Sequence, residues 1–179
     1  FGENFNSGQP VGWQFSQVVT IANNTCGVPS LDGTDFMWMG NQSVAPRDMT
    51  TIPLDVSSGG QVCFDMRYAI QAQASPCEGP DLANEGVYIQ YSTDAGLSWT
   101  TMQYWSPNGG YDVMLTSWQN YCLPIPAAAQ STSTSFRWTQ LAVSGAAFDH
   151  WGLDNIMITA TAPNFNITWL HDNYSYGPG

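Results

Sequence analysis

The chain has 179 residues, enough for one domain with a real hydrophobic core, and 43% of them are hydrophobic. Only 9% are charged: there are 14 acidic residues, three arginines and no lysine, which gives a formal net charge of -11. This balance excludes nucleic acid and anionic membranes as partners, because almost nothing neutralises phosphate, whereas it suits cations such as Ca²⁺. We find no signal peptide and no apolar run long enough to span a membrane, and we interpret the chain as a processed piece of a longer secreted polypeptide.

Short β-rich runs separated by clusters of Gly, Pro, Asn and Ser predict an all-β sandwich, because helical periodicity is nearly absent. The predicted strands span residues 11–21, 34–40, 48–56, 61–70, 86–92, 98–105, 119–125, 134–143 and 151–160. Alternation is clearest in the fourth of them, where Val62, Phe64 and Met66 alternate with polar residues, as in a half-buried strand. We expect segments 71–85 and 106–118 to be long loops.

Four widely spaced cysteines indicate two disulfides formed in an oxidising compartment, with buried free thiols as the alternative. They are Cys26, Cys63, Cys77 and Cys122, and no Cys-x-x-Cys pair indicates zinc or thioredoxin chemistry. Three pairings are possible, and the sequence does not choose among them. Sequons at Asn23, Asn41, Asn166 and Asn173 are typical of a secreted glycoprotein, although an Asn-rich chain also contains such triplets by chance.

Segment 87–99 joins an alternating strand to a turn of the form Ser-x-Asp-x-Gly-x-x-Trp, the Asp-box pattern. Its defining residues are Ser92, Asp94, Gly96 and Trp99. Asp94 can accept hydrogen bonds across the turn, Gly96 can adopt a positive φ, and Trp99 can cover the turn from the next strand. Such turns occur on extracellular, often sugar-binding β-proteins and are seldom active sites. A sialidase-type propeller is excluded, because it needs repeated boxes and about twice this length.

Several further motifs follow one another in a defined order. They are Glu-Asn-Phe-Asn-Ser-Gly-x-Pro-x-Gly-Trp at 3–13, Cys-Gly at 26–27, Ser-Leu-Asp-Gly-Thr-Asp-Phe at 30–36, Val-Cys-Phe-Asp-Met-Arg-Tyr at 62–68, Cys-Glu-Gly-Pro at 77–80, the Asp-box strand at 85–92, Phe-Arg-Trp at 136–138 and His-Trp-Gly-Leu-Asp-Asn-Ile at 150–156. This order resembles a reelin-type subrepeat, with a weaker similarity to MAM domains. The resemblance implies a two-sheet antiparallel jelly roll, related in shape to carbohydrate-binding modules, and an extracellular role without catalysis. We therefore expect one domain over residues 1–161, followed by a linker or packed extension at 162–179.

The resemblance also implies a structural Ca²⁺ that bridges the N-terminal segment and the last strand. Calcium takes about six to eight oxygen ligands from carboxylates, carbonyls and water. The predicted protein ligands are Glu3, Asp35 and Asp154, with Asn6 and Asp32 in reserve. The alternative is that these are ordinary turn and surface residues of an acidic protein.

Aromatic residues make up 13% of the chain, and exposed aromatic rings can stack on the apolar faces of sugars. The predicted glycan-binding residues are Trp105, Tyr111 and Trp118, which lie in or beside the 106–118 loop and are not required by the core. We assign the other tryptophans to the core or to turn covers. The alternative is that every aromatic side chain simply packs inside the fold.

No catalytic constellation stands out. His150 and His171 are the only histidines, and Asp149 faces away from its neighbour His150 if both lie in a strand. No Gly-x-Ser-x-Gly, His-Glu-x-x-His or phosphate-binding loop occurs. The sequence favours a non-catalytic extracellular module that binds a glycan, an extracellular protein, or neighbouring domains or copies of a larger secreted polypeptide. The alternatives are a secreted carbohydrate-active enzyme and a structural spacer or subunit of a surface assembly, with segment 165–170 as its contact.

Overall fold

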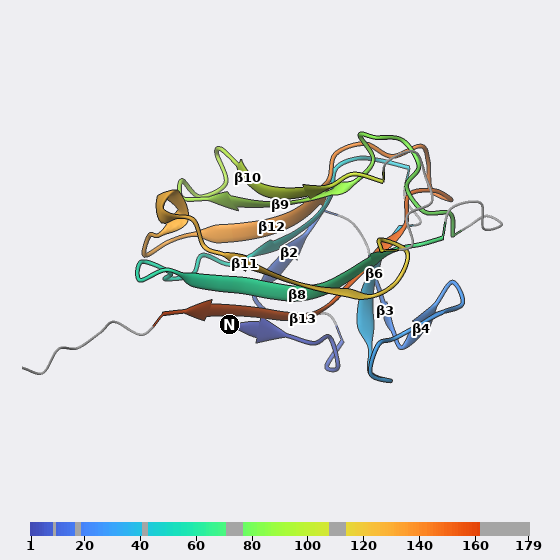
Figure 1. Cartoon of the computed structure of the whole chain (residues 1–179), viewed down its shortest axis with the longest axis horizontal. Coiled ribbons are helices and arrows are strands. Elements are labelled where there is room, and N and C mark those ends of the chain that lie inside the picture. Colours follow the sequence, from blue (N-terminus) through green and yellow to red (C-terminus); the bar gives the residue numbers. More distant parts are fainter. Residues whose placement is uncertain (9, 17–18, 41–42, 71–76, 108–113, 162–179) are drawn as a thin grey trace, which may run out of the picture.

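The structure is a computed structural model that describes residues 1–8, 10–16, 19–40, 43–70, 77–107 and 114–161. Its strands form two antiparallel sheets that pack face to face around one core (Figure 1), so the predicted all-β sandwich is confirmed. The expected extension at 162–179 and the predicted contact segment 165–170 lie outside the described residues. Within the described part of the chain, no helix is long and apolar enough to cross a membrane.

The larger sheet has the strand order β11–β8–β13–β6–β3, and β1 pairs with the second half of β13. Its strands are β1 (Gly2–Glu3), β3 (Thr20–Ala22), β6 (Phe36–Met39), β8 (Gly60–Tyr68), β11 (Gln119–Pro124) and β13 (Trp151–Ala160). The smaller sheet has the order β10–β9–β12–β7–β2. Its strands are β2 (Trp13–Phe15), β7 (Arg47–Thr51), β9 (Val87–Ser92), β10 (Thr100–Trp105) and β12 (Ser135–Gln140). A separate hairpin joins β4 (Asn24–Thr25) to β5 (Val28–Pro29), and Ala127–Ala129 form a single 3-10 turn.

The predicted strand over 11–21 is wrong as a single strand. Its two ends are β2 and β3, which belong to different sheets, so the chain crosses the sandwich between them. The crossing begins at Ser16, whose hydroxyl donates to the Pro46 carbonyl and accepts from the Asp48 amide. Predicted strand 48–56 also ends early, at Thr51, shortly before a proline that lacks an amide donor. The two-residue strands β1, β4 and β5 were not predicted, because two residues carry no periodicity.

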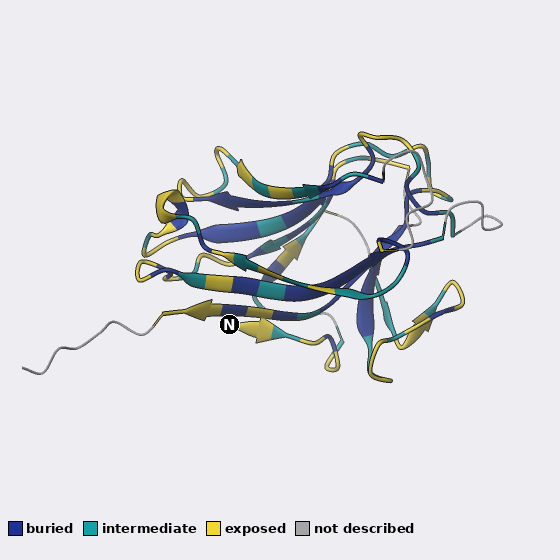
Figure 2. Cartoon of the chain, in the orientation of Figure 1, coloured by how far each residue is buried: buried dark blue, intermediate teal, exposed yellow. Residues whose placement is uncertain are grey.

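The main core lies between the sheets, where inward-facing residues alternate with outward-facing ones along each strand (Figure 2). Trp138 of β12 lies at its centre, with ring centroids 5.9 Å from Trp13 and 5.2 Å from Phe64. All three side chains are buried. This aromatic cluster joins the two sheets across the sandwich and fixes how their outer faces are presented.

A second, smaller cluster covers the outer face of the larger sheet. Phe36 and Trp38 point away from the main core, because they alternate along β6 with the core residues Met37 and Met39. They pack with Val28 of the β4–β5 hairpin, and Trp118 is packed against the same cluster. The hairpin therefore closes one end of this face and gives it a core of its own.

The structure pairs the four cysteines as Cys26–Cys77 and Cys63–Cys122. Cys26 lies in the β4–β5 turn, so its disulfide ties the hairpin to the segment that precedes β9. Cys63 and Cys122 face each other at paired positions of β8 and β11. The first bridge therefore links separate elements, whereas the second staples two strands that already pair.

The Asp-box forms the turn between β9 and β10. Asp94 accepts hydrogen bonds from the Ser98 hydroxyl (2.5 Å), the Ser98 amide (2.9 Å) and the Ser92 hydroxyl (2.7 Å), and Gly96 has a φ of 85°. These bonds lower the pKa of Asp94 to about 2, which keeps its carboxylate charged. Asp94 therefore serves the turn rather than proton transfer.

Candidate functional site

Asp154 is the most unusual carboxylate of the larger sheet. It lies on β13 directly across from Asp65 of β8, on the face that points away from the main core. Its side chain is fully buried; Oδ1 accepts the Asn155 amide (2.8 Å), whereas Oδ2 has no hydrogen-bond partner. A buried, unpaired carboxylate oxygen is costly unless a proton or a cation neutralises it.

The charges around Asp154 also favour a bound proton or cation. Burial raises the pKa of Asp154 to about 7, and the negative charges of Asp32, Asp65 and Asp35 add to this rise. Asp32 and Asp35 come from the loop before β6 and Asp65 from β8, so with Asp154 of β13 the four carboxylates come from three separate segments of the chain. Repulsion between them makes this cluster suited to a cation.

Neighbouring amides hold the cluster in place. Asn155, with a left-handed φ of 48°, donates from Nδ2 to Asp65 Oδ2 (3.0 Å), and Asn120 donates to Asp65 Oδ1 (2.9 Å). On the other side, Asn6 accepts the Asp35 amide with its side-chain oxygen (3.0 Å), which ties the N-terminal segment to the loop before β6. We name this cluster the Asp154 site, made of Asp32, Asp35, Asp65 and Asp154.

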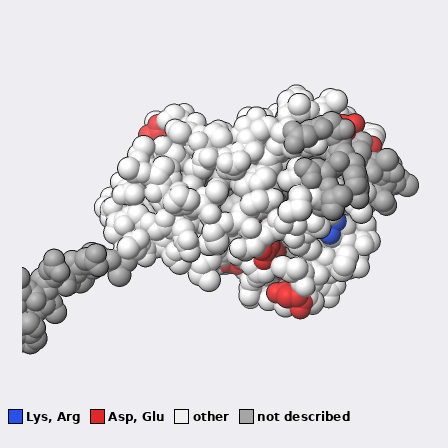
Figure 3. All heavy atoms as spheres, in the orientation of Figure 1, with Lys and Arg blue, Asp and Glu red and all other residues white. Residues whose placement is uncertain are grey.

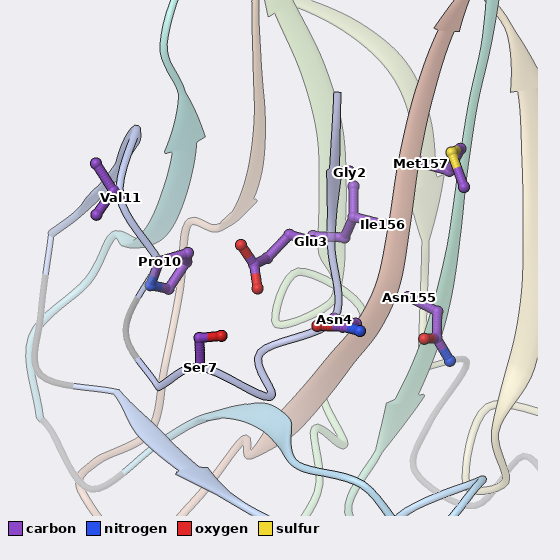
Figure 4. Close-up of a pocket in the computed structure, with 9 residues that line it drawn as sticks. All are labelled: Gly2, Glu3, Asn4, Ser7, Pro10, Val11, Asn155, Ile156 and Met157. Atoms are coloured by element: carbon purple, nitrogen blue, oxygen red, sulfur yellow. The ribbon is translucent and has the colours of Figure 1, made fainter.

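Glu3 does not belong to this site, which corrects one predicted ligand. The register pairs Glu3 with Ile156, a core residue, so Glu3 faces the opposite side of the sheet from Asp154. Its carboxylate accepts the Phe5 amide (2.6 Å) and points into a cavity of about 560 Å³, toward Ser7 (Figure 4). Neither the predicted set of Glu3, Asp35 and Asp154 nor the Asp154 site is among the described ligand groups whose atoms all lie within 4.8 Å of one another, so the carboxylates of the Asp154 site are more widely spaced than in such a group.

A tighter acidic cluster was not predicted. Asp81, Glu85 and Asp149 place carboxylate oxygens within 4.8 Å of one another, and Glu85 and Asp149 are only 2% and 1% exposed. Glu85 accepts the Leu82 amide (2.9 Å) and the Ser144 hydroxyl (2.5 Å), while Asp149 accepts the Ser144 amide (2.5 Å). This buried acidic triad could hold a metal ion. Only tertiary structure joins its two loops, so the sequence offered no signal for it.

The triad shares protons in the absence of a cation. Burial raises the pKa of Asp149 to about 7, and the charge of Glu85 raises it further. Burial also opposes the charge of Glu85, but hydrogen bonds from Ser144 and Leu82 outweigh it and lower the pKa of Glu85. An acid with a raised pKa beside a charged carboxylate has the form of a glycosidase pair. Asp149 lines a cavity of about 270 Å³ together with Glu78, Asp81 and Ser144, whereas Glu85 is 2% exposed and does not line it, so only one carboxyl of this pair borders the cavity.

His150 is a structural residue rather than a catalytic one. It is fully buried, its Nδ1 accepts the Trp38 indole N–H (3.0 Å), and its Nε2 faces the Ala146 carbonyl (3.3 Å). Burial lowers the pKa of His150 to about 4, so the ring is neutral. His150 also lies within 4.8 Å of Cys26 and Cys77, but both sulfurs are committed to a disulfide and cannot act as thiolate ligands.

The predicted glycan-binding aromatics are not brought together. Trp105 is only 8% exposed and packs in the core against Phe64 and Tyr121, so its expected place outside the core is wrong. Trp118 is half-buried and donates its indole N–H to the Pro29 carbonyl (3.0 Å) in the β4–β5 hairpin. Tyr111 lies outside the described residues. Among the described members of this set, Trp105 therefore belongs to the core and Trp118 to the packing of the β4–β5 hairpin.

Comparison with known proteins supports the fold that these residues build. The family model described as Reelin subrepeat B matches residues 20–159. Among solved structures, the K1 cleaved adhesin domain of Lys-gingipain from Porphyromonas gingivalis W83 is 16% identical, with a TM-score of 0.55 over 90% of this chain and 98% of that one. The CBM22-2 xylan-binding domain of Paenibacillus barcinonensis Xyn10C is 15% identical, with a TM-score of 0.55 over 90% and 99%. The TmCBM61 structure in complex with β-1,4-galactotriose is 11% identical, with a TM-score of 0.55 over 88% and 94%. At these identities the likeness shows the fold alone.

Proposed function

The chain belongs to the reelin subrepeat B family, and on that premise we propose that it is a non-catalytic, extracellular binding module stabilised by Ca²⁺. Two disulfides support the extracellular assignment, because such bonds persist in oxidising compartments. An adhesin domain and two carbohydrate-binding modules share the fold, which supports a glycan or an extracellular protein as the ligand. Only Asp149 of the Glu85–Asp149 pair borders the neighbouring cavity, and this supports binding over hydrolysis, which needs two carboxyl groups at the substrate.

The unpaired oxygen of Asp154 is the observation that carries the calcium proposal. It is buried and feels the negative charges of Asp32, Asp35 and Asp65, and Asn6 and Asn155 fix two of these carboxylate-bearing segments. Carboxylate and amide oxygens are the ligands that Ca²⁺ takes. When bound, the ion supplies positive charge that neutralises the cluster. The chain's own part is to join the last strand, β8 and the loop before β6 at one point.

Calcium is expected to raise the melting temperature of the wild-type protein, and Asp154→Asn is expected to abolish that rise. At a Ca²⁺ concentration 100 times the dissociation constant, the gain is about 2.7 kcal/mol of unfolding free energy. The variant should be at least as stable as the wild type in EDTA, since it removes an uncompensated charge. Differential scanning calorimetry with Ca²⁺ or EDTA measures both effects.

Asp149→Asn is the matched control for this experiment. It removes an equally buried carboxylate from the acidic triad and leaves the Asp154 site intact. We expect it to keep the calcium-dependent rise. If Asp149→Asn loses the rise and Asp154→Asn keeps it, the ion binds the triad instead. If the melting temperature of the wild-type protein is the same with Ca²⁺ and with EDTA, the calcium proposal is refuted.

Acid is expected to stabilise the metal-free protein. Asp149 and Asp154 both have folded-state pKa values of about 7, raised from 3.8. The folded state therefore binds their protons more tightly than the unfolded chain, and this stabilisation is present below about pH 4 and lost as the pH rises through about 7. The slope reaches at most about 1.4 kcal/mol per pH unit for each group.

Urea unfolding in EDTA across this range measures the effect. The midpoint should fall as the pH rises toward 7, whereas saturating Ca²⁺ should flatten or reverse the trend, because the ion replaces the proton at Asp154. A midpoint that rises steadily with pH in EDTA would show that neither carboxyl is protonated in the folded protein.

A further inference from the structure

The smaller sheet turns one face toward solvent, and its side chains differ from those of an ordinary protein surface. Along β9 and β12, Val87, Ile89 and Trp138 point into the core, so Tyr88, Gln90 and their neighbours point outward. The cross-strand register places the outward residues in two rows. One row is Tyr104, Tyr88, Thr139 and Asp48, and the other is Thr101, Gln90, Arg137, Thr50 and Gln14. We name these residues, with Trp99, the outer face; Gln90 and Thr139 point to this side but are covered by their neighbours, with 7% and 0% of their surface exposed.

One part of the outer face is aromatic and fixed. The rings of Tyr88 and Tyr104 stack at a centroid distance of 4.0 Å and an angle of 23°. The Tyr104 hydroxyl accepts the Gly86 amide (3.1 Å) and donates to the Ala83 carbonyl, so this ring cannot turn freely. Both rings are half-buried and keep part of their surface in solvent. They form a preformed apolar platform on an otherwise polar sheet.

The other part of the outer face is a connected polar network. Arg137 Nε donates to Gln90 Oε1 (2.8 Å), and Gln90 Nε2 donates to the Thr101 hydroxyl (3.0 Å). The guanidinium of Arg137 stacks over Trp99, 4.2 Å from the ring centroid, and lies 4.0 Å from Asp48. These contacts hold the side chains before any ligand arrives, which lowers the entropy lost on binding.

The charge of the outer face specifies the ligand. Asp48 and Arg137 are its only charged residues and lie next to each other, so the face is close to neutral although the whole chain carries -11. Even on the side shown in Figure 3, acidic atoms form a few separate patches within a largely uncharged surface. Hydroxyls, amides and aromatic rings without net charge fit a neutral, hydroxyl-rich ligand.

We propose that the outer face binds a neutral polysaccharide chain. The Tyr88–Tyr104 platform and Trp99 stack on the apolar faces of sugar rings, while the exposed Gln14 and Thr101 and the half-buried Asp48 exchange hydrogen bonds with the sugar hydroxyls. The proposal rests on the proposed function as a binding module and assigns its ligand class and its surface. Tyr88, Tyr104 and Trp99 thus take the role predicted from the sequence for Trp105 and Trp118, whose side chains pack inside the fold.

Native affinity electrophoresis with xylan, β-1,4-galactan and polygalacturonate tests this assignment. The wild-type protein should be retarded by at least one of the two neutral polymers and not by the anionic one. Tyr88→Ala should weaken that binding about tenfold, the equivalent of about 1.4 kcal/mol. Tyr88→Phe keeps the ring and should bind within about twofold of the wild type, because stacking needs the ring and not its hydroxyl. Met157→Ala, which removes an exposed apolar side chain from the larger sheet, should bind like the wild type.

The possible outcomes separate this proposal from the function on which it rests. Retardation by a neutral polymer that Tyr88→Ala abolishes, with an unchanged melting temperature, supports the outer face as the site. Retardation that survives both Tyr88→Ala and Trp99→Ala overturns the site and leaves the binding function standing. No retardation by either neutral polymer, or retardation by polygalacturonate alone, overturns the neutral-polysaccharide assignment. A protein partner captured through the outer face would overturn the ligand class in the same way, while keeping the binding module.

Discussion

Arg47→Ala is expected to lower the free energy of unfolding by about 3–5 kcal/mol, the range for breaking a buried charged network. Arg47 is fully buried at the start of β7. Its guanidinium donates to the carbonyls of Gly145 (2.9 Å), Phe148 (3.0 Å) and Asp149 (2.9 Å), and to the Gln140 side chain (3.2 Å). It thus holds the loop that carries one member of the acidic triad.

Two further variants show whether the geometry or the charge of Arg47 matters. Arg47→Lys keeps the charge but lacks the planar fork that reaches several carbonyls at once, so we expect it to recover only part of the loss. Arg137→Ala removes an arginine of the outer face whose side chain is 18% exposed, and with one side-chain hydrogen bond and one ring contact it should cost less, about 1–2 kcal/mol. Urea unfolding of the three variants measures the differences. Similar losses for Arg47→Ala and Arg137→Ala would contradict the role assigned to Arg47.

The strands were predictable where apolar and polar residues alternate over many positions. The alternation in β8 and the Asp-box strand β9 identified both strands to within a residue or two, because a buried face imposes a period of two on the sequence. The hairpin β4–β5 and strand β1 carry no such pattern. They form because a disulfide and pairing with β13 hold them, and both are tertiary contacts that a local pattern does not encode.

The residues of the candidate sites also fall into those that a local motif suggests and those that only the tertiary structure brings together. Asp154 was found from its motif, but Asp65 was missed because only the β8–β13 register sets the two carboxylates side by side. Asp81, Glu85 and Asp149 were missed because their loops meet only in the folded sandwich. Tyr88 lay inside a strand that was predicted well, yet nothing local to that strand shows which of its faces is left open to solvent. Residue type and spacing thus suggest chemistry, while register and layer order decide which residues share a site.

The two disulfides are expected to respond differently to removal, although a chain-entropy argument treats them alike. Their cysteines are 51 and 59 residues apart, so loop closure predicts a cost of about 4 kcal/mol for either bridge. That value assumes an unchanged folded state. Cys63→Ser with Cys122→Ser satisfies the assumption, because β8 and β11 remain paired along their length and hold the strands in place.

Cys26→Ser with Cys77→Ser does not satisfy it. The β4–β5 hairpin has strands of only two residues each, so without its bridge it can open while both sheets stay folded. If the folded variant relaxes in this way, its free energy falls. The loss of unfolding free energy caused by removing this disulfide must then be smaller than loop closure alone predicts. Hydrogen exchange should show faster exchange at residues 24–29 in this variant and not in the other, with sugar binding unchanged in both, because the outer face belongs to the opposite sheet. Equal protection of the hairpin in both variants would mean that packing against Phe36 and Trp38, and not the disulfide, keeps it closed.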